Sequence, residues 1–141
     1  MRPSQANRRK ARGKRRRAAA AAELALLLPL LCYICAITID YARLFFAWTT
    51  IAECAYNGAY YLADSNVATG SQWTSYQQAA LADAANLSPT PTVSSTAGTD
   101  SNGNLYQEVT VTYNFSTQFS YPGIPSAVTL TRKLRMAQTP P

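Results

Sequence analysis

The stretch Ala18–Ile39 reads AAAAAELALLLPLLCYICAITI, and the rest of the chain is organised around it. It carries one charged residue, Glu23, near its start. As a helix it would be about 33 Å long, at roughly 1.5 Å per residue, which matches a hydrocarbon core of about 30 Å. The sequence therefore predicts a membrane-spanning helix. We expect it to stay in the mature protein, because it is longer than the apolar run of a removable signal peptide.

Charge is distributed unevenly around this stretch. The chain has 141 residues and a formal net charge of +6, yet nine of its 13 basic residues lie between Arg2 and Arg17. That segment has no acidic and no large apolar residue, so it cannot bury a core of its own. Basic residues directly beside a span favour the cytoplasmic side and contact anionic lipid headgroups. We therefore expect a cytoplasmic leader and membrane lipid as a partner; nucleic acid, held through its phosphates, is the weaker alternative.

The helix is expected to continue beyond the membrane. Asp40 and Arg43 are three residues apart and can meet on a helix surface. With Tyr41 they are predicted to mark the exit from the membrane, where aromatic residues are common. Apolar residues then recur at spacings of three and four, which is typical of a helix with one buried face: Tyr41, Leu44, Phe45, Trp48, Ile51, Ala52, Ala55, Ala59, Leu62 and Ala63.

The remaining residues predict a small α+β body. After a break at Asn66–Gly70, Ser71 is a suitable N-cap for a second helix over Gln72–Leu87. Strands are expected over Thr92–Ser95, Leu105–Phe115 and Ala127–Arg135, the second with strict alternation of apolar and polar residues. Because neither layer can bury its apolar face alone, the strands should form an antiparallel meander that packs on the long helix beside the second helix.

These expectations divide the chain into four parts. They are a leader (residues 1–18), a transmembrane helix (19–40), its extramembrane continuation (41–66) and an extracytoplasmic body (67–141). The tyrosines at 56, 60 and 61 are expected to pack in that body, because aromatics at helical spacing are more often core residues.

No arrangement of side chains suggests catalysis. Histidine is absent, which removes the usual general base and the commonest metal ligand. Cys32 and Cys35 lie at membrane depth without a second pair, and Cys54 stands alone, so neither a zinc site nor a disulfide framework is indicated. The carboxylates are single and have no visible base partner. We expect no enzyme, no cofactor and no metal.

Several of these features together resemble one family. A basic leader precedes a small residue, Ala18, then four residues and Glu23, and the apolar helix that follows contains Pro29. Asp40-Tyr41-Ala42-Arg43 comes next, with Glu53 and Gly58-Ala59-Tyr60 further on. Over about Arg15–Ala63 the chain is similar to the TadE-like family of the tight-adherence (Flp-type) pilus, a branch of the type IV pilin-like proteins.

The resemblance implies a pilin-like fold, processing and assembly. A prepilin peptidase would cut between Ala18 and Ala19, and Glu23 would then be the fifth residue of the mature chain. The product would be a minor pilin or pseudopilin of a pilus or related secretion system. Its partners would be other pilins and the inner-membrane assembly platform, in an assembly of several kinds of subunit, with the C-terminal body outside the cytoplasm.

Simple physical chemistry explains why Glu23 and Pro29 could serve processing and assembly. A cut before Ala19 would remove the leader charges and leave a cationic amine, which the Glu23 carboxylate of a neighbouring subunit could pair with in a packed bundle. Pro29 removes one backbone donor and would kink the helix, which can help it repack between lipid and filament. The alternative is an uncleaved single-pass anchor that carries a small extracytoplasmic binding domain.

Overall fold

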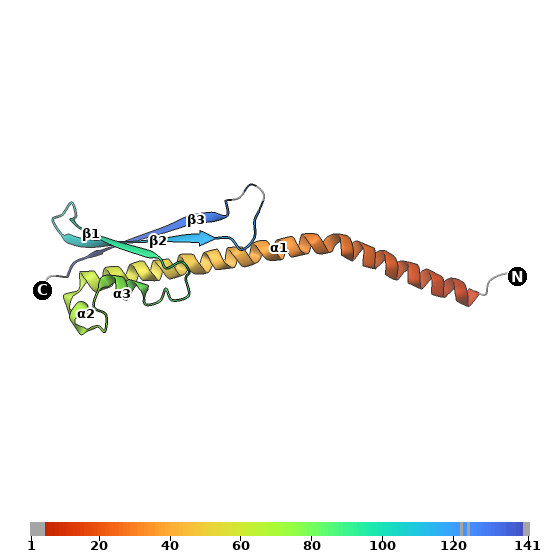
Figure 1. Cartoon of the computed structure of the whole chain (residues 1–141), viewed down its shortest axis with the longest axis horizontal. Coiled ribbons are helices and arrows are strands. Elements are labelled where there is room, and N and C mark those ends of the chain that lie inside the picture. Colours follow the sequence, from red (N-terminus) through yellow and green to blue (C-terminus); the bar gives the residue numbers. More distant parts are fainter. Residues whose placement is uncertain (1–4, 122, 124, 140–141) are drawn as a thin grey trace. The chain divides into compact units, whose positions relative to one another are not determined.

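The computed structural model describes residues 5–121, 123 and 125–139, and the side chains of those from Ala18 onward. Clustering of contacts divides the chain into two units, the first ending at Ile39 and the second beginning at Asp40. The predicted α+β class, with a long N-terminal helix, short helices and an antiparallel sheet, is confirmed (Figure 1). The elements are α1 (Gln5–Ala63), α2 (Ser65–Gly70), α3 (Tyr76–Leu81), β1 (Thr92–Thr99), β2 (Leu105–Ser116) and β3 (Ala127–Ala137).

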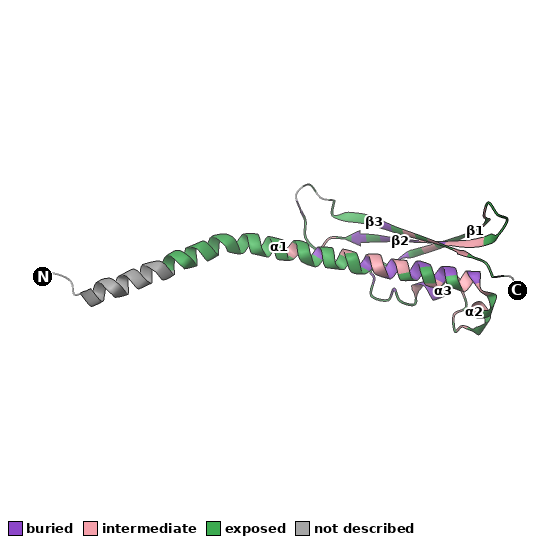
Figure 2. Cartoon of the chain, turned by 180° about the vertical axis from the view of Figure 1, so that it is seen from behind, coloured by how far each residue is buried: buried purple, intermediate pink, exposed green. Residues whose placement is uncertain are grey.

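In the first unit, α1 buries almost none of its apolar side chains. From Ala18 to Ile39 every residue is exposed except Ala36, which is half-buried (Figure 2). Burying one leucine is worth about 1.5–3 kcal/mol, so this surface is unfavourable in water. A helix that is apolar all round belongs in a large core or in lipid. By length and composition this segment can cross a membrane once.

In the second unit, the three strands form an antiparallel sheet in the order β1-β2-β3. The alternation predicted for β2 is confirmed, because every second side chain is buried from Val109 to Phe115. The central strand aligns its apolar face with both neighbours, pairing Val111 with Val93 and Val109 with Leu134. The strands run one to four residues beyond the predicted ends, because their outermost residues still find partners across the ladder.

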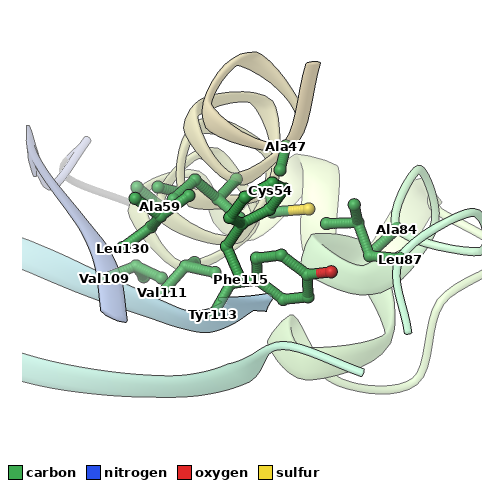
Figure 3. Packing of buried hydrophobic residues seen from close by; sticks show 12 residues of the cluster. Ala47, Cys54, Ala59, Ala84, Leu87, Val109, Val111, Tyr113, Phe115 and Leu130 are labelled. Atoms are coloured by element: carbon green, nitrogen blue, oxygen red, sulfur yellow. The ribbon is translucent and has the colours of Figure 1, made fainter. Parts of the chain in front are cut away.

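The second half of α1 supplies the other side of the core. Cys54 and Ala59 pack with Val109 and the rest of the buried face of β2, as Figure 3 shows. Ile51 belongs to the same buried cluster. Most buried residues of the helix are small: Ala47, Cys54, Ala55, Gly58, Ala59 and Ala63. Small side chains let neighbouring elements approach the helix closely, so α1 can pack on the sheet and on the region of α3 together.

Gly58 shows how tight this packing is. A Cβ atom placed on Gly58 would lie 3.1 Å from the Cβ of Ala80 in α3 and 3.2 Å from Cγ1 of Val109 in β2. Glycine lowers helix stability by about 1 kcal/mol relative to alanine. Here the absence of a side chain is what allows two elements to meet the same turn of α1.

The predicted buried face of α1 was partly wrong. Tyr41 and Phe45 are exposed, whereas Thr50 and Cys54 are buried. The reason is that α1 is covered on two sides, by the sheet and by α3, so the buried face is set by which residues these elements cover. The expectation that the tyrosines at 56, 60 and 61 pack in the body was also largely wrong. Tyr56 and Tyr60 are exposed and stack on each other with ring centroids 6.0 Å apart, and Tyr61 is half-buried.

The second helix also differs from its prediction. Residues 66–70, expected to break the chain, belong to α2, which begins after Asp64 accepts a hydrogen bond from the Asn66 N–H. The helix expected over Gln72–Leu87 is reduced to α3. Its N-cap is Ser75, which accepts from the Gln78 N–H, while the hydroxyl oxygen of Ser71 accepts a local bond from the Trp73 N–H. Local side-chain bonds of this kind compete with helix formation.

One charged residue on β3 is accommodated by the helix. Arg132 interrupts the apolar face of the strand, and the sequence offered no partner for it. In the structure its guanidinium lies over the indole ring of Trp48, 4.0 Å from the ring centroid. A cation above an aromatic face is attracted by the ring quadrupole. Arg132 can therefore lie on the same face of β3 as Leu130 and Leu134.

Candidate functional site at the end of the apolar segment

Asp40, the first residue of the folded unit, binds a loop that is distant in sequence. Its side chain is 7% exposed. One carboxylate oxygen, Oδ1, accepts a hydrogen bond from the backbone N–H of Gln118 at 2.8 Å. The other, Oδ2, accepts from the N–H of Phe119 at 3.2 Å and from the hydroxyl of Tyr121 at 2.9 Å. Asp40 therefore fixes the β2–β3 loop to α1; Figure 1 shows where the two strands and α1 lie.

The loop needs such an acceptor because of where the strands end. β2 ends at Ser116 and β3 begins at Ala127, and the N–H of Thr117 donates to the carbonyl of Ser126 at 2.9 Å to close the base of the loop. The next two backbone N–H groups have no place in the sheet ladder. Donors left without a partner cost free energy when water is excluded, and the carboxylate of Asp40 satisfies both.

Arg43 completes the site on the helix side. Its Nη1 donates to Oδ1 of Asp40 at 3.0 Å, so the two residues meet as their spacing allows. The guanidinium also lies 5.4 Å from the ring centroid of Phe115. The Arg43 side chain is 45% exposed, which leaves part of the cation accessible from outside while its position is held by a carboxylate and a ring.

The hydrogen bonds decide the charge of Asp40. Burial alone would raise the pKa of its carboxyl group. The donors from Gln118, Tyr121 and Phe119 all lower it, Arg43 adds a further lowering, and together they hold the pKa of Asp40 below its ordinary value. Asp40 is therefore a carboxylate at neutral pH, with the guanidinium of Arg43 beside it.

The segment of α1 that contains Asp40 and Arg43 matches a known protein family. Residues 18–59 match the family model described as TadE-like protein. The resemblance inferred from Glu23, Pro29 and the Asp40–Arg43 run is thereby confirmed for this segment. No curated protein and no solved structure matches the chain.

The TadE-like segment covers two different parts of α1. Ala18, Ala19, Glu23 and Pro29 lie on its exposed apolar part, with Pro29 inside the helix. Their roles in processing and assembly stay predictions, as does the role of Asp40, Tyr41 and Arg43 at a membrane exit. The end of the TadE-like segment lies in the small-residue face that packs on the sheet. The loop that Asp40 binds lies outside the matched residues.

Cys54, in the packed part of the TadE-like segment, has an unreactive thiol. Burial, with the nearby charges of Asp83 and Glu53, raises the pKa of Cys54 to about 11. Because the thiolate is the reactive form, Cys54 acts as a small apolar side chain in the core. Among the residues that the structure describes, no group of three or more Cys, Asp or Glu side chains could hold a metal ion.

Sequence reasoning missed the partners of Asp40. Gln118 and Phe119 contribute through backbone N–H groups, so their identity carries no signal. Tyr121 contributes a hydroxyl from the loop between β2 and β3. A usable signal did exist on the helix, because Asp40 lies four residues before Leu44 and seven before the buried Ala47, on a face that becomes covered. A carboxylate in such a position requires donors from another element.

Proposed function

We propose that this protein is a membrane-anchored minor pilin or pseudopilin that takes part in assembling a tight-adherence or type IV-like pilus or a related secretion system. The observation that carries the proposal is the TadE-like match on a helix in which residues 18–39 are apolar and almost all exposed, while the later residues 47–63 contribute to a packed core. A helix built this way can be held in lipid by one half and fixed to a folded body by the other.

The proposed mode of action is packing with other subunits. In the membrane, the exposed leucines and isoleucines of residues 24–39 contact lipid. In an assembly, the same side chains would contact helices of other pilins, held by van der Waals packing and pairing of polar groups. The proposed partners are a prepilin peptidase, other pilins and an inner-membrane platform. The leader would lie in the cytoplasm and the body outside it.

Glu23 is the residue proposed to link processing with assembly. A carboxylate within an apolar span is costly and such residues are usually functional. After cleavage between Ala18 and Ala19, the new amine and the Glu23 carboxylate of a neighbour would neutralise each other inside the bundle. Before cleavage, the leader charges would hold the helix in the membrane.

The test is the mass of the protein extracted from membranes. When a prepilin peptidase is co-expressed, the protein should lose Met1–Ala18, and Glu23→Ala should stay uncut or fail to enter assemblies. The matched control is Glu53→Ala, which changes an exposed glutamate in the same TadE-like segment outside the apolar stretch and should be processed like the wild type. A wild-type protein that keeps its leader in a host with an active pilus system would leave the uncleaved anchor as the better account.

A further inference from the structure

A cavity of about 500 Å³ lies beside the first turns of α1 after Asp40. Three segments of the second unit line it. Arg43 and Phe46 come from α1, Asn86 and Ser88 from the segment between α3 and β1, and Phe115 from β2. This volume lies within the range of about 300–1,000 Å³ that is typical of small-molecule sites. No role assigned above uses it.

On its polar side, the cavity is lined by the guanidinium of Arg43. The guanidinium of Arg43 has five N–H donors, and its Nη1 is bound to Asp40. With its side chain 45% exposed, donors remain for an incoming oxygen. Because Asp40 and the Phe115 ring already hold the guanidinium, a ligand would not have to order the side chain. Arginine matches the geometry of phosphate oxygens with its planar fork.

Phe46, Leu87 and Phe115 give the cavity an apolar wall beside the polar Asn86 and Ser88. This part of α1 lies where the chain is proposed to leave the membrane. Arg43 is four residues beyond Ile39, about 6 Å along a helix axis. Tyr41, Phe45 and Phe46 are 68%, 61% and 51% exposed, as expected for aromatic residues at the level of lipid headgroups.

We propose that this cavity holds the phosphate of a phospholipid headgroup, with Arg43 binding the phosphate oxygens and Phe46 contacting the first methylene groups. The inference rests on the membrane anchoring in the proposed function. A soluble phosphate could use the cation, but it would gain nothing from the apolar wall or from the exposed aromatics around it. A phospholipid uses both, so the cavity fits the lipid better than the free anion.

The test uses the full chain in lipid nanodiscs that contain a small fraction of phosphatidylglycerol with a photoreactive diazirine next to its headgroup. After illumination, labelled peptides are located by mass spectrometry. Labelling is expected at residues 42–47 and also at residues 86–88, which are distant in sequence from the apolar stretch. Diacylglycerol with the same diazirine lacks the phosphate and should label residues 86–88 far less.

The chain offers a closely matched control for Arg43. Arg135 also binds a carboxylate, that of Glu108 at 3.1 Å, and also lies over an aromatic ring, that of Tyr106 at 3.9 Å; its side chain is 55% exposed. Arg43→Gln should lower labelling of residues 86–88 by about tenfold, as expected for the loss of a charge-assisted hydrogen bond. Arg135→Gln should leave it unchanged.

A second variant keeps the test valid if Arg43→Gln disturbs the fold through Asp40. Asn86 is exposed at the cavity wall, and Asn86→Trp should obstruct the cavity and lower labelling of residues 42–47 without touching Arg43. The proposal is overturned if diacylglycerol labels as strongly as the phospholipid, or if Arg43→Gln labels like the wild type. It is also overturned if excess inorganic phosphate removes the labelling, because the cavity is then a site for the free anion.

The same experiment separates this inference from the proposed function. Labelling of residues 18–39 reports that the apolar stretch lies in lipid. If those residues are labelled and residues 86–88 are not, the cavity proposal fails and the membrane anchor stands. If residues 18–39 stay unlabelled, the anchor itself fails and the cavity proposal fails with it.

Discussion

Replacing Gly58 by leucine should destabilise the folded body by about 3 kcal/mol, the upper part of the range for overpacking a close-packed core. A Cβ at this position already approaches Ala80 and Val109 to 3.1 and 3.2 Å, and leucine adds three more carbon atoms. Domains of this size are stable by about 5–15 kcal/mol, so the loss is a large fraction of the total. Thermal unfolding of the full chain in detergent, followed by near-ultraviolet circular dichroism, measures it.

The control for this prediction is another glycine of the same unit. A Cβ on Gly70, at the end of α2, would meet no other atom within 4 Å, so Gly70→Leu should change stability little. If Gly58→Leu unfolds at the wild-type temperature, the close packing of α1 between the region of α3 and β2 is not present in the protein.

Replacing Asp40 by asparagine should release the β2–β3 loop from α1. Asparagine offers one acceptor oxygen where the carboxylate offers two, and its amide group would face donors such as the Phe119 N–H. We expect a fall in melting temperature of at least about 5 °C, and hydrogen exchange at the amides of Gln118 and Phe119 that is faster by about tenfold or more. Unchanged exchange at these two amides would contradict the assigned contacts.

The role of Asp40 also has a pH dependence. Because its pKa is lower in the folded state than the ordinary value of about 3.9, the ionised form favours folding. Its contribution is complete above that ordinary value and is lost as the pH falls through the lower, folded pKa. Wild-type stability should therefore drop in acid below about pH 4, and Asp40→Asn should show a smaller drop.

The control for both readouts is Asp100 in the β1–β2 loop. Its carboxylate accepts hydrogen bonds from the N–H groups of Asn104 and Asn102, which lower its pKa. Asp100→Asn should alter the turn itself and leave exchange at Gln118 and Phe119 unchanged.

The parts of the fold that the sequence predicts correctly are those with a long periodic signal. The alternation in β2 extends over eleven predicted residues and places Val109, Val111 and Phe115 on the buried face, as observed. The apolar run of α1 and the threes-and-fours spacing after Asp40 predict one long helix from Ala18 to about Ala63, and this part of α1 is observed without interruption. The helix also extends back to Gln5 through basic residues that were not expected to be helical, because the leader has no apolar periodicity to signal a helix. In both cases, local periodicity and tertiary packing favour the same structure.

The failures lie where the signal is short or the partner is distant. Before residues 72–87, Ser71 and Ser75 can each act as an N-cap. Where the helix begins depends on hydrogen bonds between residues only two or three positions apart. The buried face of α1 depends on which elements cover it, so Phe45 could not be distinguished from Cys54 by hydrophobicity. At the candidate site, Asp40 and Arg43 are visible in the sequence, but Gln118 is 78 residues away and takes part through its backbone.

Protease accessibility in intact spheroplasts tests the central claim, that residues 18–39 cross a membrane with the leader inside and the body outside. The chain would carry an epitope before Met1 and another after Pro141, in a host without a prepilin peptidase so that the leader is retained. We predict that external proteinase K removes the C-terminal epitope, while the N-terminal epitope is lost only after lysis. An N-terminal epitope that is digested in intact spheroplasts, or an intact chain recovered in the soluble fraction, would contradict the account.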